Sequence, residues 1–410
     1  MRIETLLILL TNLLLMALAL WTAYSAIYFF IFSISGIFYR EPVGRNREKH
    51  RFALLIPGYK EDNVIVEVAR QALQQSYPSA LFDVFVIADS FHPATLLRLR
   101  ELPVKVIEVS FEKSTKVKSL NKALEQLDTS YDLVVILDAD NVMEHRFLEK
   151  VNSRFTTDVV ALQTHRVAKN LDTPLALLDA ISEEVNNHVF RKGHRVLGLS
   201  AALIGSGMVF RFPMIRNELA RLKAIGGFDK ELEMNLLQQG IKIHYMNDTL
   251  VFDEKVSHSD TFSGQRRRWL SAQFIYFGRY FRSAVTSLFR FGNIDFFDKL
   301  AQMALMPRIL LLGITLTGSC IALIAGLLPA ASHWTEQLWI TGQLWHLLTL
   351  LTFTGFIAAI PRRFYNQQLL SALLYLPKGF VLMLSSLLKI KGANRQFIHT
   401  QHGQPQTMQK

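Results

Sequence analysis

The sequence predicts an α/β domain with a mostly parallel sheet, flanked by apolar helices long enough to cross a membrane. Between about residues 51 and 270, short apolar runs alternate with segments of helical spacing, which is typical of parallel sheets. Residues 5–38 are almost wholly apolar, and this texture returns after residue 300. Half of all residues are hydrophobic, which is high for a purely soluble protein. The expected strands are 52–56, 84–87, 104–109 and 133–137, and the expected helices include 63–75 and 116–127.

The N-terminal apolar segment carries no charge between Glu4 and Arg40. As one helix it would reach roughly 50 Å, more than the ~30 Å hydrocarbon core. It is too long for a signal-peptide core, and no small-residue cleavage site follows it. We expect one long tilted span, with a tight pair of spans as the alternative. A basic cluster then places its C-terminal end in the cytoplasm: Arg40, Arg45, Arg47, Lys49 and Arg51.

The C-terminal region contains further candidate spans. Residues 301–328 and 338–360 are each long enough to cross, and the loop 329–337 lacks Lys and Arg, as a non-cytoplasmic loop should. Pro377 interrupts a third apolar stretch, 367–390, which is either a span or a broken interfacial element. The expected organisation is an N-terminal transmembrane helix (1–40), a cytosolic α/β domain (50–275), an interfacial segment (276–300), C-terminal transmembrane or interfacial helices (301–390) and a polar cytosolic tail (391–410).

Charge and cysteine content narrow the partners. The formal net charge is +11, which anionic lipid, nucleic acid or a phosphate-bearing substrate could each explain. No zinc-finger spacing or RNA-binding aromatic signature is present, so nucleic acid is not expected. Much of the positive charge flanks apolar segments, which favours membrane lipids. A single cysteine, Cys320, excludes a disulfide framework and a thiolate metal site within one chain.

The strongest local signal is a buried strand, 133–137, that runs into Asp138, Ala139 and Asp140. In extended chain, residues two apart point to the same side, so both carboxylates would reach one hard cation. Mg²⁺ and Mn²⁺ prefer oxygen ligands and are often completed by substrate phosphates. The alternative is an acidic turn after a strand.

Three upstream elements carry further polar groups. The first strand ends in Pro57, Tyr59 and Glu61, and the second ends in Asp89, whose carboxylate can accept hydrogen bonds from a base or ribose. A predicted helix opens with Lys116 and two more lysines, although cations oppose the dipole at a helix N-terminus. Their position suggests an anionic ligand such as a diphosphate, with a solvated helix face as the alternative.

Taken in order, these motifs resemble family-two glycosyltransferases of GT-A fold over about residues 50 to 275. The resemblance extends to membrane-integrated processive synthases of the cellulose, hyaluronan and poly-N-acetylglucosamine type. It implies a nucleotide-sugar donor, a divalent cation (Mn²⁺ or Mg²⁺) and a cytosolic active site. The implied metal ligands are Asp138 and Asp140, and the implied donor contacts are Pro57, Tyr59, Glu61, Asp89, Lys116, Asp138 and Arg268.

Two later motifs extend the resemblance. The turn Gly205-Ser206-Gly207 resembles the family's acceptor-side loop, although a simple tight turn is the alternative. The run from Gln265 to Trp269 fits the QxxRW motif of polysaccharide synthases, although it could instead mark a membrane interface. The implied acceptor contacts are Gly205, Ser206, Gly207, Gln265 and Trp269.

The family's catalytic base is an aspartate that opens a helix and is followed by a glycine some eleven residues later. That spacing indicates Asp229, with Gly240 behind it, while Phe228 replaces the family's preceding glutamate. Glu231 is the reserve candidate. One base and direct displacement imply inversion at the anomeric carbon.

Four functions remain open from the sequence. The first is a processive synthase extending a glycan at the plasma membrane of a bacterium; with about four spans it would need an export partner or homo-oligomer. The second is single addition to a membrane lipid. A nucleotide-binding scaffold that has lost catalytic activity stays open because of Phe228, and a transporter is disfavoured because no P-loop is present.

The family resemblance suggests a UDP-linked hexose or N-acetylhexosamine as the donor. A C-terminal segment with His402 resembles a nucleotide-covering loop, or is a disordered tail.

Overall fold

The apolar runs form one eight-stranded mixed sheet of order β3-β2-β1-β4-β7-β6-β8-β5. β1 pairs in parallel with β2 and β4, and β2 with β3, whereas β7 runs antiparallel to β4 and β6. The predicted mostly parallel α/β sheet is therefore confirmed. The strands are β1 (Phe52–Tyr59), β2 (Phe82–Asp89), β3 (Lys105–Val109), β4 (Leu133–Ile136), β5 (Val142–Met143), β6 (Ala161–Ala168), β7 (Met208–Arg211) and β8 (Ile243–Asp253).

Hydrophobic side chains cover both faces of this sheet. In β1, Leu54 belongs to one core cluster and Leu55 to the other, because successive side chains point to opposite faces. α2, α3 and α5 pack on one face, and α4, α8 and α9 on the other. The helices are α2 (Ile65–Ala72), α3 (Pro93–Arg100), α4 (Lys116–Gln126), α5 (Phe147–Arg154), α6 (Pro174–Asn187), the π-helix η2 (His188–Gly193), α7 (His194–Val196), α8 (Phe212–Arg221) and α9 (Phe228–Gln238).

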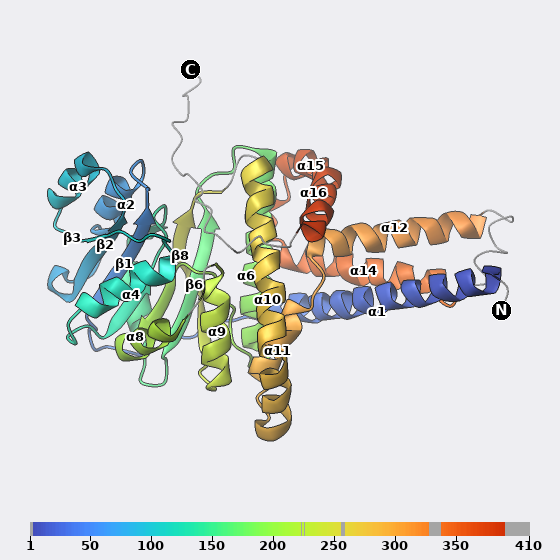
Figure 1. Cartoon of the computed structure of the whole chain (residues 1–410), viewed down its shortest axis with the longest axis horizontal. Helices are drawn as coiled ribbons and strands as arrows, with labels where there is room; N and C mark the ends of the chain where they lie inside the picture. Colours follow the sequence, from blue (N-terminus) through green and yellow to red (C-terminus); the bar gives the residue numbers. More distant parts are fainter. Residues whose placement is uncertain (1–2, 223, 225, 256–258, 328–337, 390–410) are drawn as a thin grey trace, which may run out of the picture.

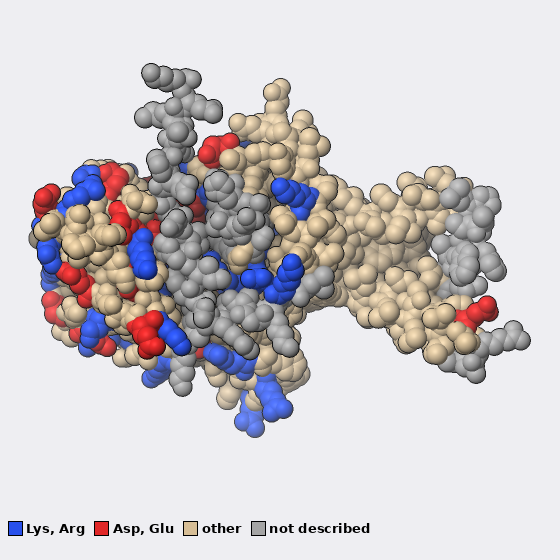
Figure 2. Space-filling model, turned by 45° about the horizontal axis from the view of Figure 1, so that its top comes forward, with Lys and Arg blue, Asp and Glu red and all other residues tan. Residues whose placement is uncertain are grey.

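Three long apolar helices lie side by side and project from the α/β domain; we call them the membrane arm (Figure 1). They are α1 (Ile3–Ile37), α12 (Arg308–Leu327) and α14 (Gly342–Ala359). Each is long and apolar enough to cross a membrane. Figure 2 shows that charged side chains gather over the domain, whereas the visible face of the arm is almost free of them. The protein is therefore membrane-associated, and α1 is one unbroken helix rather than a pair.

Between domain and arm stand α10 (Ser259–Phe291) and α11 (Ile294–Met303) (Figure 1). α10 continues without a break past residue 275, the expected end of the α/β domain. The third apolar stretch forms α15 (Gln367–Leu373) and α16 (Leu376–Leu388), which are bent by 46° to one another. Both lie at the domain end of α12 rather than along it (Figure 1), which matches the broken element that Pro377 allows.

The computed structural model describes residues 3–222, 224, 226–255, 259–327 and 338–389. The loop 329–337, the tail 391–410 and its His402 motif lie outside these residues, as does the side chain of Gln265.

Candidate active site

β1 and β2 end side by side, with Tyr59 paired to Asp89 in register. The next residues, Lys60 and Ser90, both adopt the left-handed conformation (φ 55° and 60°), which non-glycine residues rarely adopt away from functional sites. Asp89 is 1% exposed; the Ser90 hydroxyl donates to its Oδ1 at 3.0 Å, while its buried Oδ2 accepts no hydrogen bond from the described residues. A buried carboxylate oxygen without a donor indicates room for a ligand donor group.

The neighbouring donor-side candidates lie at the same edge of the sheet. Pro57 is buried within β1, Tyr59 is half-buried at its end, and Glu61 is buried just beyond it. Gly58 lies close to Phe91, because a Cβ at residue 58 would stand 2.7 Å from that ring. The structure therefore gathers these candidates at the carboxyl ends of parallel strands, where α/β folds bind ligands.

The acidic pair does not continue the strand. β4 ends at Ile136, and the Asn141 N–H donates to the Asp138 carbonyl at 3.1 Å, so residues 138–141 form a turn. The extended-chain argument for the pair was therefore wrong, although the turn keeps both aspartates at the strand end. The Asp138 side chain is 38% exposed, whereas Asp140 is 5% exposed and accepts from the Glu254 N–H (2.9 Å) and from Asn141 Nδ2 (3.1 Å).

Lys116 joins this turn to the glycine loop. Its ammonium donates to Asp138 Oδ1 at 2.5 Å and to the Gly205 carbonyl at 2.7 Å. Lys118 instead donates to a carbonyl in the loop before α4, and Lys122 pairs with a glutamate on its own helix. Of the three lysines that open the predicted helix, only Lys116 reaches the site.

The donor chemistry of the turn suits a divalent cation. Asp138 and Asp140 offer carboxylate oxygens, which Mg²⁺ and Mn²⁺ prefer. Among the described residues, no group of three or more His, Cys, Asp and Glu side chains is placed to hold a metal ion. A cation held here would therefore complete its coordination with diphosphate oxygens and water.

The glycine loop before β7 contacts the acidic turn and also contributes to the lining of the cavity. Gly205 and Gly207 have φ of 82° and 61°, which favours glycine. Ser206 is fully buried and its hydroxyl bonds Asn141 in the acidic turn. A Cβ on Gly207 would lie 2.6 Å from the Thr164 hydroxyl. Of the three predicted acceptor contacts in this loop, only Gly205 lines the cavity described below, whereas Ser206 and Gly207 are not part of its lining.

Asp229 faces the same space from the first turn of α9. Its Cγ lies 3.9 Å from the position of a Cβ on Gly205. Glu231 is buried away from the cavity, where it accepts a hydrogen bond from Arg279 of α10 at 2.8 Å. Phe228, the residue that replaces the family's glutamate, is buried with the Lys116 ammonium 5.4 Å from its ring centroid.

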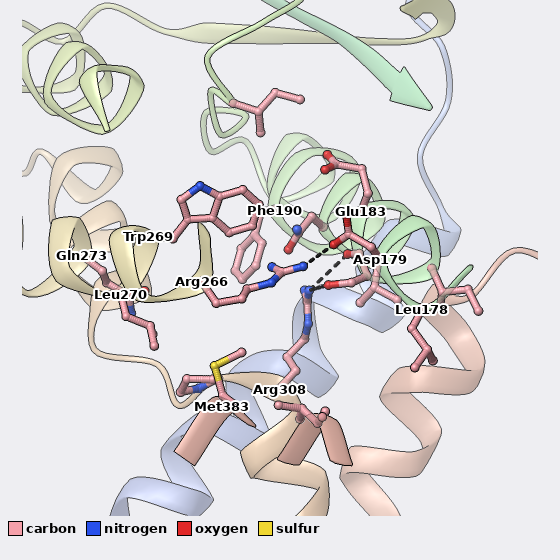
Figure 3. Close-up of a pocket in the computed structure, with 18 of the residues that line it drawn as sticks. Leu178, Asp179, Glu183, Phe190, Arg266, Trp269, Leu270, Gln273, Arg308 and Met383 are labelled. Carbon is pink, nitrogen blue, oxygen red and sulfur yellow. Dashed lines mark hydrogen bonds and ion pairs between the residues drawn. The ribbon is translucent and has the colours of Figure 1, made fainter. Parts of the chain in front are cut away.

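The QxxRW residues lie on α10 beside this space. Trp269 is exposed and lines the cavity, with the Arg266 guanidinium 4.5 Å from its ring centroid (Figure 3). Arg266 also forms an ion pair with Asp179 of α6, which the sequence did not predict. Arg268 lines the cavity too, and burial lowers the pKa of its guanidinium.

An ionic cluster in the wall of the cavity, which includes the lining residues Arg166 and Glu183, was also missed. Arg166 donates to Glu183 at 2.7 Å, and Lys255 contacts Asp253 at 3.0 Å, joining β6, α6 and β8. Burial raises the pKa of Asp253 to about 6 despite its cationic neighbours, Arg166 above all. These charges are scattered along the chain, so spacing gave no signal.

These residues border a cavity of about 1100 Å³. Lys116, Asp138, Gly205 and Asp229 line one end, and Trp269 lies farther along. Nucleophile activation and charge stabilisation can therefore act on one substrate at this end of the cavity.

The sheet and its strand-end carboxylates define a glycosyltransferase with the GT-A nucleotide-sugar-binding fold. The chain belongs to the glycosyltransferase-like family 2, whose sequence profile matches residues 50–272, more than half of the chain.

Individual relatives are similar to this chain over a smaller share of their length or at low sequence identity. A glucans biosynthesis glucosyltransferase H of Rhodopseudomonas palustris (strain ATCC BAA-98 / CGA009) is 30% identical over 158 residues, which cover 35% of this chain and 22% of that protein. The chain thus spans about a fifth of the length of this curated relative. Among solved structures, a mannosyltransferase of Pyrobaculum calidifontis in complex with GDP-Man and Mn²⁺ is similar (TM-score 0.49, 16% identity, 84% of this chain and 96% of that chain). S. aureus TarS 1-349 in complex with UDP-GlcNAc gives a TM-score of 0.38 at 15% identity (51% and 60%).

Proposed function

We propose that this enzyme transfers a hexosyl or N-acetylhexosaminyl group, with inversion, from a nucleotide-sugar to an acceptor hydroxyl at the cytosolic face of a membrane. The observation that carries the proposal is the convergence of Lys116, Asp138, Gly205 and Asp229 on one end of a single cavity. The UDP-linked donor follows the family resemblance.

The donor would bind at the strand ends. Asp89 offers its unpartnered Oδ2 to a ribose hydroxyl or a base N–H, beside Tyr59. A Mn²⁺ or Mg²⁺ ion held by Asp138 and Asp140 would supply positive charge to the diphosphate. Lys116 and Arg268 add fixed cationic groups where negative charge develops on the leaving group.

The acceptor would enter from the cavity. Asp229 takes the proton of the acceptor hydroxyl as its oxygen attacks the anomeric carbon, and the bond from that carbon to the diphosphate oxygen breaks. The nucleoside diphosphate leaves with the electron pair of that bond. Attack from the face opposite the leaving group inverts the anomeric configuration. Trp269 presents an exposed ring face on which a sugar or headgroup can stack.

Both acceptors that the sequence leaves open, a growing polysaccharide and a membrane lipid, offer such a hydroxyl. A polysaccharide product would require an export partner or a homo-oligomer. The three candidate spans agree with a multi-pass protein, for which we propose the bacterial plasma membrane.

The test is nucleotide release from a panel of UDP-sugars by the purified full chain, with Mn²⁺, with Mg²⁺ or after chelation. We expect metal-dependent release with one donor, reduced about 100-fold or more in Asp138→Ala. Asp138 is a cleaner target than Asp140, whose carboxylate also bonds the Glu254 N–H. Glu125→Ala, which removes an exposed ion pair on α4, is the control and should retain release. Release that ignores chelation and survives Asp138→Ala would contradict the proposal.

A further inference from the structure

The cavity does not end at the catalytic groups. It continues past Trp269 to the domain end of the membrane helices, where its wall is mostly apolar and Lys378 of α16 is its charged member. This far wall comes from four elements, represented by Ile309 and Leu312 of α12, Phe353 and Ile357 of α14, Leu373 of α15 and Met383 of α16. One continuous space therefore joins the site of sugar transfer to the bilayer region.

The apolar part is short. The lining begins at Phe353 of α14 and ends at Ile360, the residue after this helix, about 10 Å along the axis, or about a third of the ~30 Å hydrocarbon core. On α12 it ends at Leu312, in the first turns of the helix. Among the described residues, α1 contributes nothing to the lining. A conduit for a polymer would follow these helices through the bilayer, whereas this space reaches only the near leaflet.

A partly buried cation marks the boundary between the polar and apolar parts. Arg308, the first residue of α12, donates through Nη2 to the Ser182 carbonyl and hydroxyl, both at 3.2 Å. Its buried Nη1 makes no hydrogen bond to the described residues. Arg308 and Arg266 lie close together and extend toward the same side of α6, next to Phe190 (Figure 3). A buried N–H donor without a partner beside a cavity indicates an oxygen acceptor on the occupant.

We propose that the acceptor is a single membrane lipid, whose apolar tail lies between α12, α14 and α16 and whose polar headgroup lies between Arg308 and Trp269. This inference rests on the proposed function. A headgroup hydroxyl attacks the anomeric carbon, its proton passes to Asp229, and the nucleoside diphosphate leaves. The product is a glycolipid that returns to the leaflet from which its lipid came.

The experiment supplies the purified full chain with a radiolabelled form of the donor that supports nucleotide release, with and without a lipid extract from membranes of the native organism. We expect label in the organic phase, dependent on the extract and carried by a product with one added sugar by mass spectrometry. Label in an aqueous or ethanol-insoluble polymer would overturn the lipid acceptor and leave the glycosyltransferase intact. If no donor releases nucleotide, the proposed function itself fails.

A matched pair on α12 tests the tail site. Leu312 lines the cavity, whereas Leu316, one turn farther, does not. In Leu312→Trp the indole fills the tail space, so lipid product per nucleotide released should fall at least about tenfold, as for other changes to hydrophobic pockets. Leu316→Trp should stay within about twofold of wild type. Equal coupling in the two variants would overturn the tail site.

Arg308→Gln gives an independent reading of the headgroup site. The loss of a hydrogen bond from a charged donor should raise the KM for the lipid extract by about tenfold or more, with a smaller effect on kcat. A fall in kcat alone, with KM unchanged, would contradict contact between Arg308 and the acceptor.

Discussion

At the scale of single residues, the site depends on one lysine that contacts two loops. The Lys116 ammonium bridges the Asp138 carboxylate and the Gly205 carbonyl, so it fixes the acidic turn relative to the glycine loop before β7. A lysine so placed can follow the negative charge of a diphosphate as it leaves, because its flexible stem lets the ammonium change partners.

Substitution of this lysine should therefore be severe. We expect Lys116→Met to lower nucleotide-sugar turnover about 100-fold, the effect of losing one preorganised electrostatic group. Lys118→Met is the matched control, since Lys118 lies two residues farther along α4 and its ammonium donates to a carbonyl in the loop before α4. Steady-state kinetics on both variants decide the point, and equal losses would mean that the lysines act only through general charge.

Substitutions of the two acidic residues at the start of α9, Asp229 and Glu231, should also differ in their effect on transfer. Asp229→Asn should reduce transfer by about 10²–10⁴-fold, as expected for loss of a general base, while donor binding measured by calorimetry persists. Glu231→Gln breaks a partly exposed ion pair with Arg279 and should retain most activity. If Glu231→Gln were the inactive variant, the base would have been assigned to the wrong carboxylate.

At the scale of elements, the sequence located what depends on local pattern. The strands of the first half were found because both faces are buried, which produces continuous apolar runs such as Leu133–Ile136. The acidic turn was placed correctly in sequence, but its conformation depends on Asn141, whose side chain and N–H both bond Asp138. Hydrophobic periodicity cannot predict a turn that depends on hydrogen bonds of a single polar side chain.

Contacts between distant segments could not be predicted in this way. Asp179 on α6 and Arg266 on α10 are 87 residues apart and meet only in the folded chain. Arg308 likewise lies inside the predicted span 301–328, yet its guanidinium donates to Ser182 of α6. Single-sequence reasoning found the motif residues and missed the ionic residues that hold them.

The buried carboxylate Glu183 shows how much such contacts contribute. Burial disfavours its ionised form, but Arg166 and Lys255 outweigh burial and hold the pKa of this carboxyl well below its ordinary value. We expect Glu183→Gln to lower the free energy of unfolding by about 3–5 kcal/mol at pH 7, because Arg166 and Lys255 would then share only the carboxylate of Asp253. Glu67→Gln, which removes an exposed pair with Arg70, should cost less than about 1 kcal/mol.

The pH dependence of this difference has a definite sign. A folded-state pKa below the unfolded value of about 4.3 stabilises the fold fully above that value and progressively less as pH falls below it. The gap in stability between wild type and Glu183→Gln should therefore shrink below about pH 4. Denaturant titrations of the detergent-solubilised protein at pH 7 and pH 3.5 measure it, and a gap that widens in acid would refute the ionic account.

At the scale of the whole molecule, the α/β domain and the membrane arm are joined by specific contacts. Tyr28 of α1 donates to Asp298 of α11 at 2.7 Å and bonds His194 of α7 at 2.9 Å. A Cβ on Gly193 would lie 2.2 Å from the Phe32 carbonyl, so α1 and the π-helix approach closely. The cavity is lined by residues of the α/β domain and by residues of the apolar helices. The contacts between these two parts therefore determine how far the candidate active site lies from the bilayer.

This arrangement predicts which parts of the chain lie on each side of the membrane. α12 has 20 residues, about 30 Å of helix, which suffices to cross the hydrocarbon core. Thr341, just before α14, should therefore lie opposite the α/β domain, while the basic residues Arg362 and Arg363 stay on the domain side, as the positive-inside rule requires. Since Cys320 is the only cysteine, Cys320→Ser gives a cysteine-free background for Glu125→Cys and Thr341→Cys.

A membrane-impermeant maleimide should label Glu125→Cys only in inverted vesicles and Thr341→Cys only in right-side-out vesicles. Labelling of both positions in one vesicle orientation would show that α12 does not cross, and the near-leaflet position of the cavity would fail with it.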